Sequence, residues 1–194
     1  MTLAKAPLTL TEFLDLSETE PASEYSEYID GEILQKPMPK GKHSHLQLSL
    51  SLAINQAASN ARIAYAWPEL RCSFGDRSIV PDIAVFEWEH IPFDTDGEVP
   101  NDFFIPPDWL IEIFSPDQSH NRITQKILHS FQNGTQLGWI IDPSDRSIVV
   151  YLPNQLPMFC EAGDRPLVLM PIPLDLTCDQ IFDWLKMNQP QTSN

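Results

Sequence analysis

At 194 residues, the chain is long enough to form one domain with a sizeable hydrophobic core. A hydrophobic content of 42% and a charged content of 20% are ordinary for a folded protein and exclude global disorder. The net charge of −15, from 27 acidic and 12 basic residues, argues against generic coating of nucleic acid, because such binding depends on neutralising phosphates. A role on nucleic acid would therefore need a local basic strip or bound cations.

The remaining bulk features concern the compartment. No apolar run approaches the roughly 18 residues that a membrane helix needs, and no signal segment follows Met1. The three cysteines, Cys72, Cys160 and Cys178, have no CxxC spacing and are typical of a reducing compartment. We expect a cytoplasmic protein without a membrane span, with a single domain over residues 1–187 and a flexible tail over residues 188–194.

Local signals divide the first third of the chain. Thr9 and Glu12 have the spacing of a capping box, which predicts a helix over residues 10–16. The Asp30-Gly31 pair suits a type I′ turn and predicts a hairpin over residues 25–35. A lysine-rich loop over residues 36–42 precedes a long helix over residues 44–60, whose apolar residues recur at the helical period.

The rest of the chain alternates strands and helices. Strands are predicted over residues 63–67, 70–74, 79–88, 109–114, 137–141 and 147–152, with weaker strands near residue 158 and over residues 167–170. Residues 90–107 are acidic and rich in proline, and we expect an exposed excursion there. Helices are predicted over residues 118–132, ending at Asn133-Gly134, and over residues 177–187.

Two short apolar runs within these strands, over residues 80–85 and 109–116, each carry one carboxylate, Asp82 and Glu112 respectively. A buried carboxylate must be protonated, paired or bound to a metal. If the two strands are neighbours, Asp82 and Glu112 would form a site for Mg²⁺ or Mn²⁺, with Lys126 of the following helix close by, and phosphodiester hydrolysis is the natural reaction. The alternative is structural: Glu112 would pair with Lys126 or Arg122 and have no catalytic task.

Several segments together resemble one known family, the putative restriction endonucleases of the PD-(D/E)XK nuclease superfamily. The similarity runs over about residues 8–152 and is carried by Val80-Pro81-Asp82-Ile83-Ala84-Val85, Trp109-Leu110-Ile111-Glu112-Ile113-Phe114-Ser115-Pro116, Lys126, Gly134 and Trp139-Ile140-Ile141-Asp142-Pro143, with Leu10-Thr11-Glu12-Phe13 and Tyr28-Ile29-Asp30-Gly31-Glu32 at the amino-terminal end. The resemblance implies an α/β fold with a restriction-endonuclease-like core. This core is a central mixed β-sheet flanked by α-helices, with an amino-terminal helix and hairpin.

The resemblance also implies an activity, that of a Mg²⁺-dependent or Mn²⁺-dependent DNA endonuclease. Its metal ligands would be Asp82 and Glu112, with the backbone carbonyl of Ile113 as a third. The usual lysine of the superfamily lies two residues after the second acid, where this chain has Phe114. The resemblance therefore implies Lys126 as the catalytic lysine.

Two further residues enter through the same resemblance. Arg122 is the alternative to Lys126 as the cation of the site. Glu27 matches an acidic position of the family and is a further candidate catalytic acid, the alternative being an exposed strand carboxylate.

DNA is the expected partner, and few basic residues are available to contact it. Lys36, Lys40 and Lys42 form the one basic cluster of the sequence and, with Arg122, are the candidate nucleic-acid contacts; a solvated loop is the alternative for the lysines. His43 and His45 are two residues apart, a spacing that does not suit a zinc pair on a helix.

Other functions and assemblies stay open. One rival function is a catalytically inactive protein of the same fold that acts as a binding or assembly module. Another is a metal-dependent hydrolase acting on a small phosphorylated substrate. A symmetric homodimer is expected from the resemblance alone.

Overall fold

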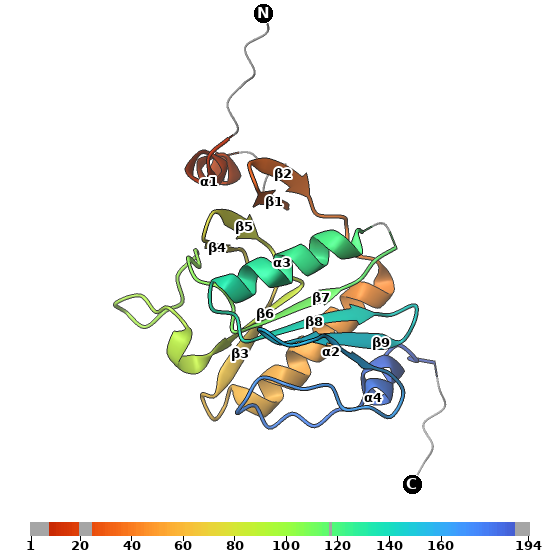
Figure 1. Ribbon diagram of the computed structural model, residues 1–194. Coiled ribbons are helices and arrows are strands. Elements are labelled where there is room, and N and C mark those ends of the chain that lie inside the picture. The colour runs from red at the N-terminus through yellow and green to blue at the C-terminus, as the bar shows by residue number, and fades with distance from the viewer. Residues whose placement is uncertain (1–7, 20–24, 117, 189–194) are drawn as a thin grey trace, which may run out of the picture.

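The computed structural model describes residues 8–19, 25–116 and 118–188 (Figure 1). Its helices are α1 (Leu10–Thr19), α2 (Gly41–Ala58), α3 (His120–Gln132) and α4 (Cys178–Asp183), with one 3-10 turn, η1 (Trp88–His90). Its strands are β1 (Ser26–Ile29), β2 (Glu32–Gln35), β3 (Ala64–Pro68), β4 (Cys72–Phe74), β5 (Arg77–Ile79), β6 (Ile83–Glu87), β7 (Trp109–Ile113), β8 (Leu137–Asp142), β9 (Ser147–Tyr151) and β10 (Met158–Cys160).

The larger sheet has the strand order β10-β9-β8-β7-β6-β3. Strands β7 and β8 are parallel and are joined by α3, as a parallel crossover requires, whereas the other neighbours are antiparallel. Helix α3 covers one face of this sheet, and α2 and α4 cover the other (Figure 1). The prediction of a central mixed sheet flanked by helices, with an amino-terminal helix and hairpin, is confirmed.

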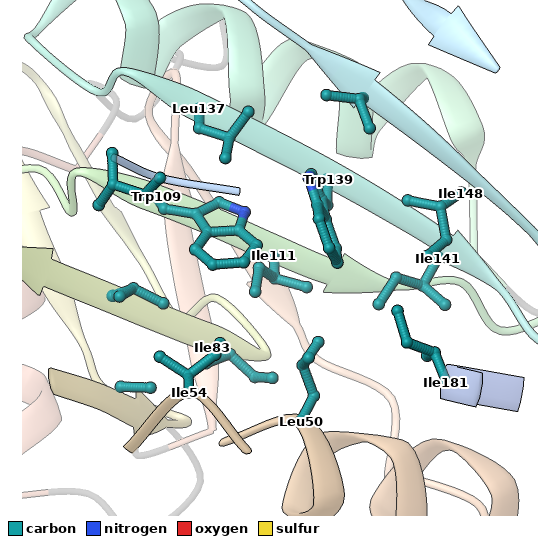
Figure 2. Packing of buried hydrophobic residues seen from close by; sticks show 14 of the residues in the cluster. Leu50, Ile54, Ile83, Trp109, Ile111, Leu137, Trp139, Ile141, Ile148 and Ile181 are labelled. Carbon is teal, nitrogen blue, oxygen red and sulfur yellow. The ribbon is translucent and has the colours of Figure 1, made fainter. Parts of the chain in front are cut away.

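Alternation along the buried strands divides the apolar residues into two cores. Trp109 and Ile111 of β7 pack toward α2, where Leu50 and Ile54 meet the sheet (Figure 2). Leu110 points the other way, toward the residues of α3. Because successive side chains of a strand point to opposite faces, the next even-numbered residue of β7, Glu112, belongs to the face that α3 covers.

A smaller sheet with the strand order β2-β1-β5-β4 lies beside the larger one. Asp30 and Gly31 have φ values of 53° and 86°, so the predicted hairpin with two left-handed turn residues is confirmed. The predicted continuous strand over residues 79–88 is wrong, because β5 belongs to the smaller sheet and β6 to the larger. Pro81 lies between them and has no amide hydrogen to donate to a ladder.

Further differences from the predicted elements are local. The predicted strand over residues 167–170 is absent from the described part of the chain. Pro166 and Pro171 flank that segment, and Leu169 is buried there without ladder pairing. Helix α4 is shorter than predicted, although its Thr177–Gln180 capping box is formed. Of the predicted tail, only residue 188 lies within the described residues.

The structure also describes the state of the cysteines and the length of the helices. All three cysteines are free and buried, with Cys72 and Cys178 fully inaccessible to solvent. Within the described ranges, no helix has the length and apolar character that crossing a membrane would take.

Gly138 of β8 lets α3 approach the sheet closely. A Cβ atom at this position would lie 2.6 Å from Cγ2 of Ile127, in the residue next to Lys126. We expect Gly138→Ala to lower the free energy of unfolding by about 1–3 kcal/mol, because a methyl group would be inserted into a filled core. Urea unfolding checks this, with Gly41→Ala as the control, since no atom of the described residues lies within 4 Å of a Cβ there. Equal midpoints for the two variants would contradict the packing described.

Candidate active site

Asp82 and Glu112 lie at neighbouring strand ends. Strands β6 and β7 pair with Ile83 opposite Ile111, and continuing this antiparallel register by one residue places Asp82 opposite Glu112. Both residues are fully buried, with 0% of their surface exposed. Two carboxylates thirty positions apart in the sequence are therefore enclosed in one place.

Glu112 shares a lysine with the amino-terminal hairpin. The Lys126 Nζ atom donates to Glu112 Oε1 at 2.8 Å and to Glu27 Oε1 at 2.6 Å. Glu27 Oε1 also accepts from the backbone amide of Val80, at 2.8 Å. Glu27 is only 7% exposed, so the alternative of an exposed strand carboxylate is wrong.

Lys126 lies on the buried face of α3. Ile123, Ile127 and Ser130 are on the same face and are also buried, so the amphipathic pattern of the helix turns the lysine inward. Burial by itself would lower the pKa of Lys126, but the attraction of Glu112 and Glu27 outweighs it and raises that pKa well above its usual range. The ammonium group is therefore charged at neutral pH.

Asp82 is surrounded by donors from other parts of the chain. Its Oδ2 atom accepts from the backbone amide of Ile113 at 2.6 Å and lies 3.0 Å from His43 Nε2. Its Oδ1 atom lies 2.7 Å from Lys36 Nζ, which is also 2.7 Å from Glu69 Oε2. Asp82 is thus held by the chain segments before α2, within α2 and at the end of β7.

The two buried carboxylates differ in acidity. Burial acts to raise the pKa of Asp82, but Lys36 and His43 hold it well below its usual range. Burial also raises the pKa of Glu112, in this case to about 7, because Asp82 and Glu27 oppose the attraction of Lys126.

Sequence reasoning missed several neighbours of Asp82. His43 was considered only for a zinc pair with His45, whereas His45 Nε2 contacts the carbonyl of Trp184 at 2.9 Å, away from this site. Gln47 lies one helical turn after His43, and its Nε2 donates to the carbonyl of Asp82 at 2.7 Å and to Glu69 Oε1 at 2.8 Å. Polar residues four apart on the face of α2 that also carries Leu46 and Leu50 were the signal that could have found this cluster.

Each of the two acids has one oxygen that is suited to act as a ligand of a divalent cation. Asp82 Oδ1 and Glu112 Oε2 are buried, and neither has a hydrogen-bond partner in the part of the chain that the structure describes. No group of three or more His, Cys, Asp or Glu side chains is placed to hold a metal within residues 8–19, 25–116 and 118–188. Two carboxylates with a backbone carbonyl fit Mg²⁺, which usually keeps several waters and substrate oxygens in its shell.

The predicted DNA contacts separate into two places. Lys36 and Arg122 line a cavity of about 210 Å³ that also borders Glu27 and Lys126. The side chain of Lys36 is only 10% exposed, so a solvated loop is wrong for this residue. Lys40 and Lys42 are exposed at the start of α2 and line a different cavity.

Lys126, and not the alternative Arg122, is the cation that contacts Glu112. Arg122 is exposed in the first turn of α3, and Glu112 pairs with Lys126. Lys126 is therefore the cation that reaches the acids, while Arg122 lies at the cavity.

These features define a class of protein. A mixed sheet with a parallel crossover, flanked by helices and carrying two buried acids at adjoining strand ends, is a nuclease-like α/β fold. The chain belongs to the Uma2 family, described as putative restriction endonuclease, whose model matches residues 10–181. It is similar to the crystal structure of a putative nuclease from Anabaena variabilis, with 50% sequence identity and a TM-score of 0.83 over 92% of this chain and 99% of that chain. None of the curated proteins matches the chain.

Removal of the Lys126 ammonium tests the pairing. We expect Lys126→Met to lower the free energy of unfolding by about 3 kcal/mol, the low end for a broken buried pair, because Glu112 can take up a proton. Adding Glu112→Gln should restore part of this stability, since the uncompensated buried charge is then removed.

Chemical denaturation at pH 7 measures both effects. Lys186→Met is the matched control, because that lysine forms an exposed pair with Asp183 and such pairs contribute about 0–1 kcal/mol. Equal losses in the free energy of unfolding for the two lysine variants would contradict the prediction, because the buried ion pairs of Lys126 would then stabilise the fold no more than an exposed pair does.

Proposed function

We propose that this protein is a Mg²⁺-dependent or Mn²⁺-dependent DNA endonuclease that hydrolyses phosphodiester bonds. The observation that carries the proposal is the pair of buried carboxylates, Asp82 and Glu112, each with one oxygen lacking a hydrogen-bond donor among the described residues. The charged Lys126 ammonium lies beside them. Membership of the Uma2 family supports the same reaction class.

In this proposal Asp82, Glu112 and the backbone carbonyl of Ile113 hold the metal ion. When bound, the ion would lower the pKa of a water molecule and offset negative charge on the phosphate. Lys126 stabilises the negative charge that develops on the phosphate oxygens, and it needs no reorganisation because it is already protonated and held in place. Glu27 also accepts a hydrogen bond from that ammonium and helps to fix its position.

The proposed substrate approach is through the cavity that Lys36, Arg122 and Lys126 line. The chain as a whole has an excess of acids, but three basic residues are gathered at this cavity. They supply the local basic strip that binding a polyanion requires. Lys40 and Lys42 extend the basic surface at the start of α2 and are proposed to contact the DNA backbone.

A second candidate function is non-catalytic. Both carboxylates are already paired with lysines, Asp82 with Lys36 and Glu112 with Lys126, as in an ion-pair network that serves structure alone. On this alternative the protein would be a binding or assembly module of the nuclease fold.

Plasmid nicking separates the two functions. Purified protein is expected to nick supercoiled plasmid with Mg²⁺ or Mn²⁺ and not with EDTA. Asp82→Asn and Lys126→Ala should each reduce the rate by at least about 100-fold, because they remove a metal ligand and the transition-state cation.

Glu98→Gln is the matched control, because Glu98 is an exposed acid in the loop between β6 and β7. It should nick at the rate of the parent. Nicking that survives equally in Asp82→Asn would identify a contaminating nuclease and favour the non-catalytic alternative.

Arg122 provides a test of DNA binding that does not depend on cleavage. With Ca²⁺ in place of Mg²⁺, Arg122→Gln should weaken binding to duplex DNA uniformly across sequences and reduce the slope of log affinity against log salt by about 1, the value for one phosphate contact. Fluorescence anisotropy of a labelled duplex measures both quantities.

Arg165→Gln makes the same change in charge at an exposed pair with Asp175, in the segment preceding α4. Its salt slope should equal that of the parent. A slope unchanged by Arg122→Gln would place the phosphate contacts elsewhere.

A further inference from the structure

Lys36 was predicted only as a surface contact, yet it lies within the carboxylate site. It follows β2 directly. Its backbone amide donates to the carbonyl of Tyr25 at 3.0 Å, and this hydrogen bond holds the backbone of Lys36 in place. Its Nζ atom lies 2.7 Å from Asp82 Oδ1, one of the two carboxylate oxygens without a hydrogen-bond partner among the described residues.

The two ion pairs of Lys36 are not equivalent. The ammonium group donates a hydrogen bond to Glu69 Oε2 at 2.7 Å. Its contact with Asp82 Oδ1 is an equally short ion pair, and that oxygen has no hydrogen-bond partner among the described residues. Lys36 thus donates a hydrogen bond to Glu69 and forms a close ion pair with Asp82.

Electrostatics explains why an ammonium group occupies this position. Glu27, Glu69, Asp82 and Glu112 bring four carboxylates together, and Lys36 and Lys126 supply two positive charges, so ionised acids leave an excess of two negative charges. Burial would lower the pKa of Lys36, but Asp82 and Glu112 outweigh it and raise that pKa. Lys36 is therefore attracted to both acids that we propose as metal ligands.

From this geometry we propose that Lys36 is an internal cation that competes with the divalent metal for Asp82. The inference rests on the proposed function, because it concerns the same metal ligands. Binding of the metal displaces the ammonium from Asp82 Oδ1, while Glu69, 36% exposed at the solvent edge, keeps it close. The cavity that Lys36 lines offers it space, and in the proposed reaction an oxygen of the substrate phosphate would be its partner there.

Metal affinity tests the competition without any cleavage assay. In calorimetric titrations with Mn²⁺ and no DNA, Lys36→Gln is expected to bind at least tenfold more tightly than the parent, because no ammonium has to leave. Lys36→Arg keeps the positive charge and should bind no more tightly than the parent. Lys186→Gln removes the same charge from an exposed lysine, so it measures the effect of net charge, which we expect to stay within twofold.

A measurement on the parent protein covers the case in which a Lys36 variant fails to fold. Acetylation by an amine reagent, followed by mass spectrometry, reports the reactivity of each lysine. Lys36 should be protected in metal-free protein and should react several-fold faster in saturating Mn²⁺, whereas Lys42 should react at the same rate in both.

The outcomes separate this inference from the proposed function. If the parent binds Mn²⁺ but Lys36→Gln binds no more tightly and Lys36 reactivity is unchanged, the competition is overturned and the metal site stands. If neither the parent nor Lys36→Gln binds Mn²⁺, both the competition and the metal-dependent function are overturned.

Discussion

The site depends on one ammonium group, that of Lys126, held between two carboxylates from different parts of the fold. Through it, α3 is tied to β7 by Glu112 and to the amino-terminal hairpin by Glu27. A buried lysine is tolerated only when its charge is compensated, so the helix, the larger sheet and the hairpin have to meet at this point. The ion pairs that fix the hairpin against α3 and β7 therefore also fix the position of Lys126, the cation of the proposed reaction.

The junction between the two sheets explains how the acids come together. The chain leaves β5 of the smaller sheet, passes through Pro81 and enters β6 of the larger sheet, and Asp82 lies at that change of sheet. At this position the Asp82 carboxylate meets donor groups from α2, from β7 and from the segment after β2. Acid side chains that would be unfavourable in the middle of a sheet are accommodated at its end.

The strongly acidic composition and the proposed binding of DNA are compatible because charge is distributed unevenly. The cavity beside the site is lined by three basic residues, Lys36, Arg122 and Lys126, and by one acid, Glu27. The exposed acids over residues 94–98 lie in the loop between β6 and β7. Association with a polyanion depends on the local field at the binding surface, so the net charge of −15 limits generic coating more than it limits one basic cavity.

The sequence by itself determined the periodic elements and the residue types of the site. A continuous apolar run located β7, the helical period of apolar residues located α2, and the Asn133-Gly134 pair located the end of α3, because such patterns follow from which faces of an element are buried and where it stops. Asp82, Glu112 and Lys126 stood out as charged residues in apolar surroundings. Only the tertiary structure decided that residues 79–88 divide between two sheets, and that Glu27, Lys36 and His43 join the site. Those contacts join residues 39 to 99 positions apart, and no local pattern encodes them, because they arise where separately folded elements pack against one another.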